Sequence, residues 1–165
     1  MIFRLILGAV LSYLLGSLNF GIILSRKFQK EDVRTHGSGN AGSTNMLRNY
    51  GKLPAVATIL GDMAKVAVAI LLVRLLVGND LYAQQPIFIK SFAGLFCVLG
   101  HIFPCFFRFK GGKGVATCGG MVYDRLADRP DPAGGVFCGR PNYQMGIAGF
   151  HLNGNPVPGA DGSVL

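Results

Sequence analysis

The chain has 165 residues, of which 50% are hydrophobic and only 15% are charged, yet its formal net charge is +8. Its mean hydropathy of +0.42 excludes an ordinary soluble domain of this size and places it in the membrane class. The basic excess favours anionic lipid head groups or a phosphorylated substrate over nucleic acid, because the charges lie in short loops between apolar runs. The four cysteines contain no CxxC pair, which argues against a disulfide framework or a metal site.

Three apolar runs predict three transmembrane helices and therefore an all-α integral membrane protein. Each run is long enough for a helix to cross roughly 30 Å of hydrocarbon. The predicted helices cover about residues 2–25, 53–77 and 86–107.

Two glycine-rich loops, one within residues 26–52 and one at residues 108–114, carry most of the basic side chains. The link at residues 78–85 has one acid and no base. The positive-inside rule therefore predicts that both glycine-rich loops are cytoplasmic and that the N-terminus lies outside.

The first of these loops contains the stretch HGSGNAGSTN, residues 36–45. Its glycines permit positive φ angles, which allow successive N–H groups to converge on an anion. Hydroxyl and amide side chains add donors, and an Arg fork matches phosphate oxygens. A solvated linker is the competing interpretation of this loop. The candidate phosphate ligands are Ser38, Gly39, Asn40, Gly42, Thr44, Asn45 and Arg48.

The second loop lies within the stretch GHIFPCFFRFKGGKGVAT, residues 100–117. It is not a Walker A motif, because Phe107 occupies a position that needs glycine. Its lysines are either phosphate ligands or anchors at the lipid interface. His101, at the end of the third run, either donates to a carbonyl freed by Pro104 or serves the site. The candidate phosphate ligands here are Lys110, Gly111, Gly112, Lys113 and Gly114.

Two ionisable residues, Asp62 and Lys65, lie within the second apolar run. An ionised group at the bilayer centre costs about 2.5–3.5 kcal/mol on insertion scales. Their i, i+3 spacing allows them to pair. They are expected to form either a self-neutralising structural pair or a support for the polar loops.

The segments GSLNFGIILSR, DVRTHGSGNAGSTNMLR, GDMAK and GHIFPCFFRFKGGKGVAT resemble the bacterial acyl-phosphate:glycerol-3-phosphate acyltransferase family, from about residue 10 to Thr117. The resemblance implies a seven-helix enzyme of the inner membrane, with its site on the cytoplasmic side. It implies acyl transfer from acyl phosphate to the 1-hydroxyl of glycerol 3-phosphate, giving lysophosphatidic acid and phosphate. The resemblance also implies that membrane lipid surrounds the protein and that no cofactor is required.

The same resemblance implies roles for individual residues. Ser38, Arg48 and Lys113 would bind phosphate, and the other candidates of the first loop would shape or line the nest. His101 would orient the second loop or take a proton. The candidate catalytic residues are His101, Ser38 and Asn45. An acyl phosphate is already activated, so no covalent nucleophile is required.

Beyond Thr117 the resemblance stops, and residues 118–165 contain no lysine and no defensible helical or strand periodicity. We therefore expect a partial acyltransferase domain at 1–117 and an unrelated, irregular tail at 118–165. A frameshift is the favoured origin of the tail, ahead of a natural truncation, and weak or absent activity follows from either. The alternative function is a small membrane protein that binds or conducts anions without catalysis.

Overall fold

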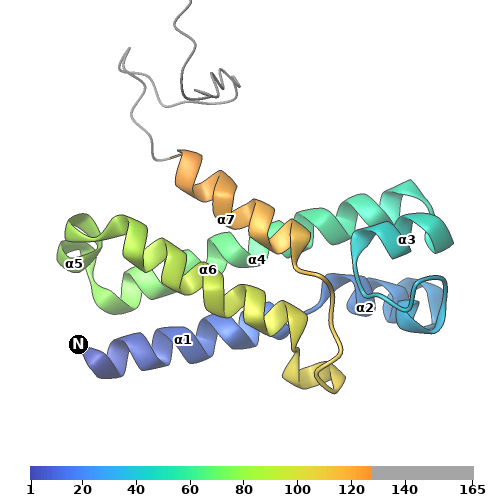
Figure 1. Cartoon of the computed structure of the whole chain (residues 1–165), viewed down its shortest axis with the longest axis horizontal. Coiled ribbons are helices and arrows are strands. Elements are labelled where there is room, and N and C mark those ends of the chain that lie inside the picture. The colour runs from blue at the N-terminus through green and yellow to red at the C-terminus, as the bar shows by residue number, and fades with distance from the viewer. Residues whose placement is uncertain (128–165) are drawn as a thin grey trace, which may run out of the picture.

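The computed structural model describes residues 1–127, and every regular element in this part of the chain is helical, as predicted (Figure 1). The elements in chain order are α1 (Ile2–Ser17), α2 (Phe20–Leu24), the π-helix η1 (Ser25–Gln29), the 3-10 helix η2 (Val33–Thr35), α3 (Ser43–Tyr50), α4 (Lys52–Val77), α5 (Asn79–Gln84), α6 (Pro86–Ile102), the 3-10 helix η3 (Cys105–Phe107) and α7 (Val115–Ala127).

Two segments are long and apolar enough to cross a membrane, and they match the second and third predicted spans. These segments are Lys52–Val77 and Pro86–Phe107. The first predicted span differs from expectation, because it is two helical segments that meet at 41°. Leu18 and Asn19 at the junction have extended backbone angles, with ψ values of 92° and 106°.

Helix α1 packs against α6 through glycine on both sides of the contact. A Cβ on Gly16 would clash with the carbonyl of Cys97, and a Cβ on Gly100 would clash with the carbonyl of Tyr13. Small residues allow helix backbones to approach closely, which is the usual way to gain packing energy within a membrane. The interior between α4 and α6 is filled by a buried cluster that includes Val66, Val73, Ile89, Ala93 and Cys97.

Both glycine-rich loops lie at one end of the helix bundle, away from α5 and the N-terminus (Figure 1). A second buried cluster, formed by Ile22, Val33, Ala41, Met46 and Ala55, lies at this end. Phe107 of η3 packs against that cluster. Phe107 therefore connects the start of the second loop to the buried cluster that supports the first loop.

Irregular structure does not begin at residue 118 as predicted, because helix α7 continues to Ala127. Tertiary contacts explain why periodicity missed it: Met121 fills the space beside Gly94, and Asp124 pairs with the buried Lys90 at 2.7 Å. The expectation was wrong for residues 118–127. The rest of the predicted tail, residues 128–165, lies outside the described residues.

The close contact of α1 with α6 predicts that Gly16→Ala destabilises the fold. The added methyl group meets rigid backbone, so the free energy of unfolding should fall by about 1–3 kcal/mol. Thermal unfolding followed by circular dichroism in detergent measures this change. Gly8→Ala is the matched control, since its methyl group meets only the Val73 side chain, at 3.2 Å. Equal melting temperatures for the two variants would contradict the packing described here.

Candidate functional site

The first glycine-rich loop is organised around the side chain of Asn45, which is 1% exposed. Its Oδ1 accepts a hydrogen bond from the N–H of Ser38 at 3.0 Å. Its Nδ2 donates to the carbonyls of Val33, His36 and Asn40, at 2.8, 3.0 and 2.9 Å. Both polar atoms of Asn45 are therefore used inside the loop, a geometry that favours a positioning role over direct contact with substrate.

The loop backbone does adopt the left-handed angles that its glycines permit, with φ of 56° at Gly37 and 67° at Gly39. The expected row of free N–H groups is nevertheless interrupted. The N–H of Gly39 donates to the carbonyl of His36 at 3.1 Å, and the N–H of Gly42 donates to Asn40 Oδ1 at 2.9 Å.

Two N–H groups at the start of α3 remain available to an anion. Those of Ser43 and Thr44 have no hydrogen-bond acceptor in the part of the chain that the structure describes. A helix N-terminus with free N–H groups attracts anions. The start of α3 can therefore contribute to anion binding by the loop.

Arg34 joins the two loops. Its guanidinium makes a bidentate ion pair with Asp32, at 2.9 and 2.7 Å. Its Nη1 also donates to the carbonyl of Phe107, the residue before the second loop, and to that of Lys110 within the loop, at 2.9 and 2.7 Å. The donors of Arg34 therefore hold the two loops together.

The pair between Asp32 and Arg34 is also an electrostatic element of the loops. Hydrogen bonding to the Arg34 guanidinium holds the pKa of Asp32 well below its ordinary value of 3.8, against the opposing effect of partial burial. Arg26 shares the same carboxylate at 2.8 Å. Asp32 therefore stays ionised at neutral pH and neutralises part of the basic loop.

The second loop folds over His101, which is 3% exposed. The carbonyl of His101 accepts the N–H of Gly112 at 3.1 Å. A Cβ on Gly112 would clash with the imidazole Nε2, and a Cβ on Gly111 would clash with the His101 carbonyl. These two glycines therefore permit close packing on His101. Gly114, with φ of 77°, is the one glycine of this turn in the left-handed region.

The expected partner of His101, a carbonyl freed by Pro104, is replaced in the structure by Lys65, whose Nζ lies 2.9 Å from the imidazole Nδ1. The ring is covered by the second loop and by the interior of the bundle. This placement favours an orienting role for His101 over proton transfer.

The remaining predicted site residues divide by exposure. Arg48, Lys110 and Lys113 are exposed, and their side chains form no ion pair within residues 1–127. Three cations are therefore available to an anion at the loop end. Of the other candidates, the exposed residues are Ser38, Gly39 and Thr44, and the partly or fully buried ones are Asn40, Gly42, Gly111, Gly112 and Gly114.

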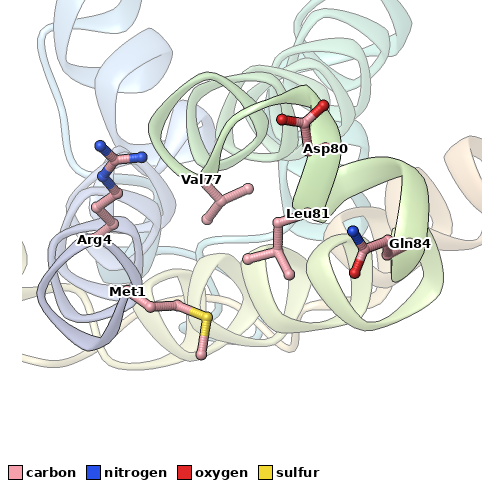
Figure 2. Close-up of a pocket in the computed structure, with 6 residues that line it drawn as sticks. All are labelled: Met1, Arg4, Val77, Asp80, Leu81 and Gln84. Carbon is pink, nitrogen blue, oxygen red and sulfur yellow. The ribbon is translucent and has the colours of Figure 1, made fainter.

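A hollow of about 390 Å³ lies at the opposite end of the bundle and is not part of this site. Figure 2 shows Arg4 and Gln84 on opposite sides of the apolar side chains of Val77 and Leu81. Neither glycine-rich loop contributes to its lining.

Sequence reasoning missed two contacts that shape the site. The bridge by Arg34 had one visible signal, an acid two residues before it in a loop otherwise dominated by bases. The pair between Lys90 and Asp124 had none, because Asp124 lies in a segment without recognisable periodicity.

Comparison with known proteins gives a consistent result. The family model described as glycerol-3-phosphate acyltransferase matches residues 6–129, which extends past the predicted limit at Thr117. A glycerol-3-phosphate acyltransferase of Pseudomonas putida strain F1 is 54% identical over 114 residues, or 69% of this chain and 57% of that protein. A Pseudomonas aeruginosa protein of the same name, from strain LESB58, is 46% identical over equal shares. The chain thus spans about half the length of the curated relatives it matches.

Solved structures agree. The crystal structure of PlsY, described as an integral membrane glycerol 3-phosphate acyltransferase in its glycerol 3-phosphate form, is similar with a TM-score of 0.60 and 39% identity. The match covers 72% of this chain and 56% of that chain. A lysophosphatidic acid form gives a TM-score of 0.58 with 38% identity, over 72% and 55% of the two chains.

The hydrogen bonds of Asn45 predict that Asn45→Ala loosens the first loop without preventing membrane insertion. Buried partners lose their hydrogen bonds, so unfolding should become easier by about 1–3 kcal/mol. Thermal unfolding in detergent measures the loss, and membrane fractionation checks insertion. Asn40→Ala, which removes only the bond to the Gly42 N–H, is the control and should have the smaller effect.

The lowered pKa of Asp32 predicts a pH dependence. The ionised carboxylate stabilises the folded chain above the ordinary pKa of 3.8, and this contribution is lost as pH falls through the lowered folded-state pKa. Between pH 5 and pH 2 the melting temperature should fall more for the wild type than for Asp32→Asn. Parallel curves for the two proteins would show that the pair does not support the fold.

Proposed function

The chain belongs to the glycerol-3-phosphate acyltransferase family, and on that basis we propose that it transfers a fatty acyl group from acyl phosphate to the 1-hydroxyl of glycerol 3-phosphate. The products are lysophosphatidic acid and inorganic phosphate. The two substrate-related forms in which PlsY was crystallised, with glycerol 3-phosphate and with lysophosphatidic acid, support this choice of acceptor and product.

The observation that carries the proposal is the Arg34 bridge, because it brings two basic loops to one end of a bundle of apolar helices. A lipid-tailed acyl phosphate and a water-soluble glycerol phosphate meet only at such a boundary. The exposed cations Arg48, Lys110 and Lys113 provide positive charge for two phosphate groups there.

The reaction needs positioning and charge more than a protein nucleophile. The glycerol hydroxyl oxygen attacks the acyl carbonyl carbon, the bond from that carbon to the phosphate oxygen breaks, and the hydroxyl proton passes to phosphate. Catalysis then consists of aligning the two reactants and stabilising the negative charge that develops on the carbonyl oxygen.

Individual residues take roles that follow from their exposure. Lys113 and Arg48 bind phosphate oxygens, aided by the free N–H groups of Ser43 and Thr44 and by the Ser38 hydroxyl. Asn45 and His101, both buried, hold the loops in place.

The proposed setting is the bacterial cytoplasmic membrane, with the loops on the cytoplasmic side and the N-terminus outside, since this orientation satisfies the positive-inside rule. Surrounding lipid accepts the acylated product. Anion conduction is disfavoured, because the buried charges of the bundle interior are paired, as Asp62 with Lys65 and Lys90 with Asp124.

The direct test is an acyl-transfer assay with membranes that contain the 165-residue chain. Radiolabelled acyl phosphate and glycerol 3-phosphate should give labelled lysophosphatidic acid, at a lower rate than the longer Pseudomonas putida relative gives it, in keeping with the expected weak activity. Membranes that contain the Pseudomonas putida relative serve as the positive control. Product from the relative and none from the chain would refute the proposal for this protein, and phosphate flux in liposomes without acyl transfer would favour the anion-conducting alternative.

The assay also tests the role of Lys113. Removal of one charge-assisted hydrogen bond of about 1.5–3 kcal/mol should make Lys113→Gln roughly 10- to 150-fold less active. Lys27→Gln, which removes an exposed cation elsewhere in the basic loop region, is the matched control and should stay near wild type. Equal losses in the two variants would mean that only overall charge matters.

A further inference from the structure

Three buried polar side chains form a cluster between the spans, just below the second loop. Asp62 and Lys65 come from α4 and His101 from α6, and each is at most 4% exposed. Lys65 Nζ lies 2.8 Å from Asp62 Oδ1 and 2.9 Å from His101 Nδ1. The cluster is larger than the self-neutralising pair that one interpretation of the sequence predicted, because it also includes His101.

The same ammonium also satisfies the break in the first span. It donates to the carbonyls of Gly16 and Leu18, at 3.0 and 3.1 Å. Carbonyls at a helix end lack donors from their own helix, and hydrocarbon offers none. Lys65 therefore supplies the hydrogen-bond donors that these two carbonyls, at the break between α1 and α2, require.

The contact with Lys65 assigns the state of His101. An ammonium has three N–H donors and no acceptor, so the imidazole Nδ1, at 2.9 Å, can only accept from Lys65 Nζ. Asp62 Oδ1 is farther from Nδ1, at 3.5 Å, and pairs with Lys65 instead. Hydrogen-bond logic therefore assigns the ring proton to Nε2. That nitrogen is on the side of the ring that Gly112 covers.

The second loop packs on both the backbone carbonyl and the imidazole of His101. The Gly112 N–H bonds to the carbonyl, a Cβ on Gly111 would clash with the same carbonyl, and a Cβ on Gly112 would clash with the imidazole. Lys113 is the next residue along the turn. A shift of His101 would therefore displace the exposed cation.

We propose that Lys65 is a positioning residue that couples the break in the first span to the turn of Gly111, Gly112 and Lys113 through His101. Its importance for catalysis rests on the proposed function, in which Lys113 binds a substrate phosphate. Its importance for the shape of the turn does not depend on the proposed function.

The test measures tryptic cleavage after Lys110 and Lys113 in the purified full chain in detergent, relative to cleavage after Lys30 in the first loop. Lys65→Met removes the ammonium, and Asp62→Asn/Lys65→Met does so without leaving a buried charge. Both should accelerate cleavage of the second loop by at least about fivefold, since its local opening becomes easier. Cleavage at the wild-type rate in the double variant would overturn the proposal.

Two comparisons separate positioning from general destabilisation. Lys90→Met/Asp124→Asn removes another ion pair, which joins α6 to α7, and should leave the cleavage ratio near that of the wild type. Equal acceleration in this control would also overturn the proposal. His101→Leu removes both the Nδ1 acceptor and the imidazole against which Gly112 packs, so it should accelerate cleavage of the second loop as the Lys65 variants do. This variant decides the matter if Lys65→Met does not fold, because cleavage of His101→Leu at the wild-type rate would overturn the proposal.

A ligand measurement distinguishes this proposal from the proposed function. Glycerol 3-phosphate should protect Lys113 from an amine-reactive reagent, and Asp62→Asn/Lys65→Met should need at least about tenfold more ligand for equal protection, a change of roughly 1.4 kcal/mol. Absence of protection in the wild type would refute phosphate binding by Lys113. The cleavage comparison would still confirm or overturn the positioning role of Lys65.

Discussion

Hydrocarbon cannot hydrogen-bond to peptide groups, and this constraint governs the bent first span. The carbonyls of Gly16 and Leu18 are acceptable inside the bundle because Lys65 donates to both. The bend lets α2 leave the direction of α1 and lie under the first loop, where Gly21 approaches the carbonyl of Ala41 too closely for a side chain. One buried ammonium therefore affects the placement of a loop far from it in the sequence.

The same rule holds in the loops, whose carbonyls are satisfied by side chains. Asn45 satisfies carbonyls within the first loop, and Arg34 satisfies one carbonyl just before the second loop and one within it. Internal satisfaction makes both loops defined surfaces rather than solvated linkers, the competing interpretation that sequence left open. It also leaves other cations, such as Lys113, exposed for an anion. A charged residue near a phosphate site is thus not always a ligand, because some of the charge is needed to build the site.

Much of the candidate site was predictable, since small residues, amides and cations gathered in two stretches of sequence. The use made of each residue was less predictable. Gly111 and Gly112 were predicted as phosphate ligands, yet neither has the positive φ that an anion-binding turn uses, and both are small because His101 lies against them. Only Gly114 in that turn follows the conformational argument. A glycine required by close approach and a glycine required by backbone angle are identical in a sequence.

The sequence by itself determined the all-α membrane class, the second and third spans, the two basic loops and the family resemblance, because hydropathy and motif content depend on neighbouring residues in the chain. Tertiary structure decided the break at Leu18, the structural use of Arg34 and the continuation of α7 beyond Thr117. Each of these depends on groups that meet from distant positions, as Lys65 meets Gly16, Arg34 meets Lys110 and Lys90 meets Asp124. Hydrogen-bond partners that only the folded chain brings together leave no pattern in local sequence.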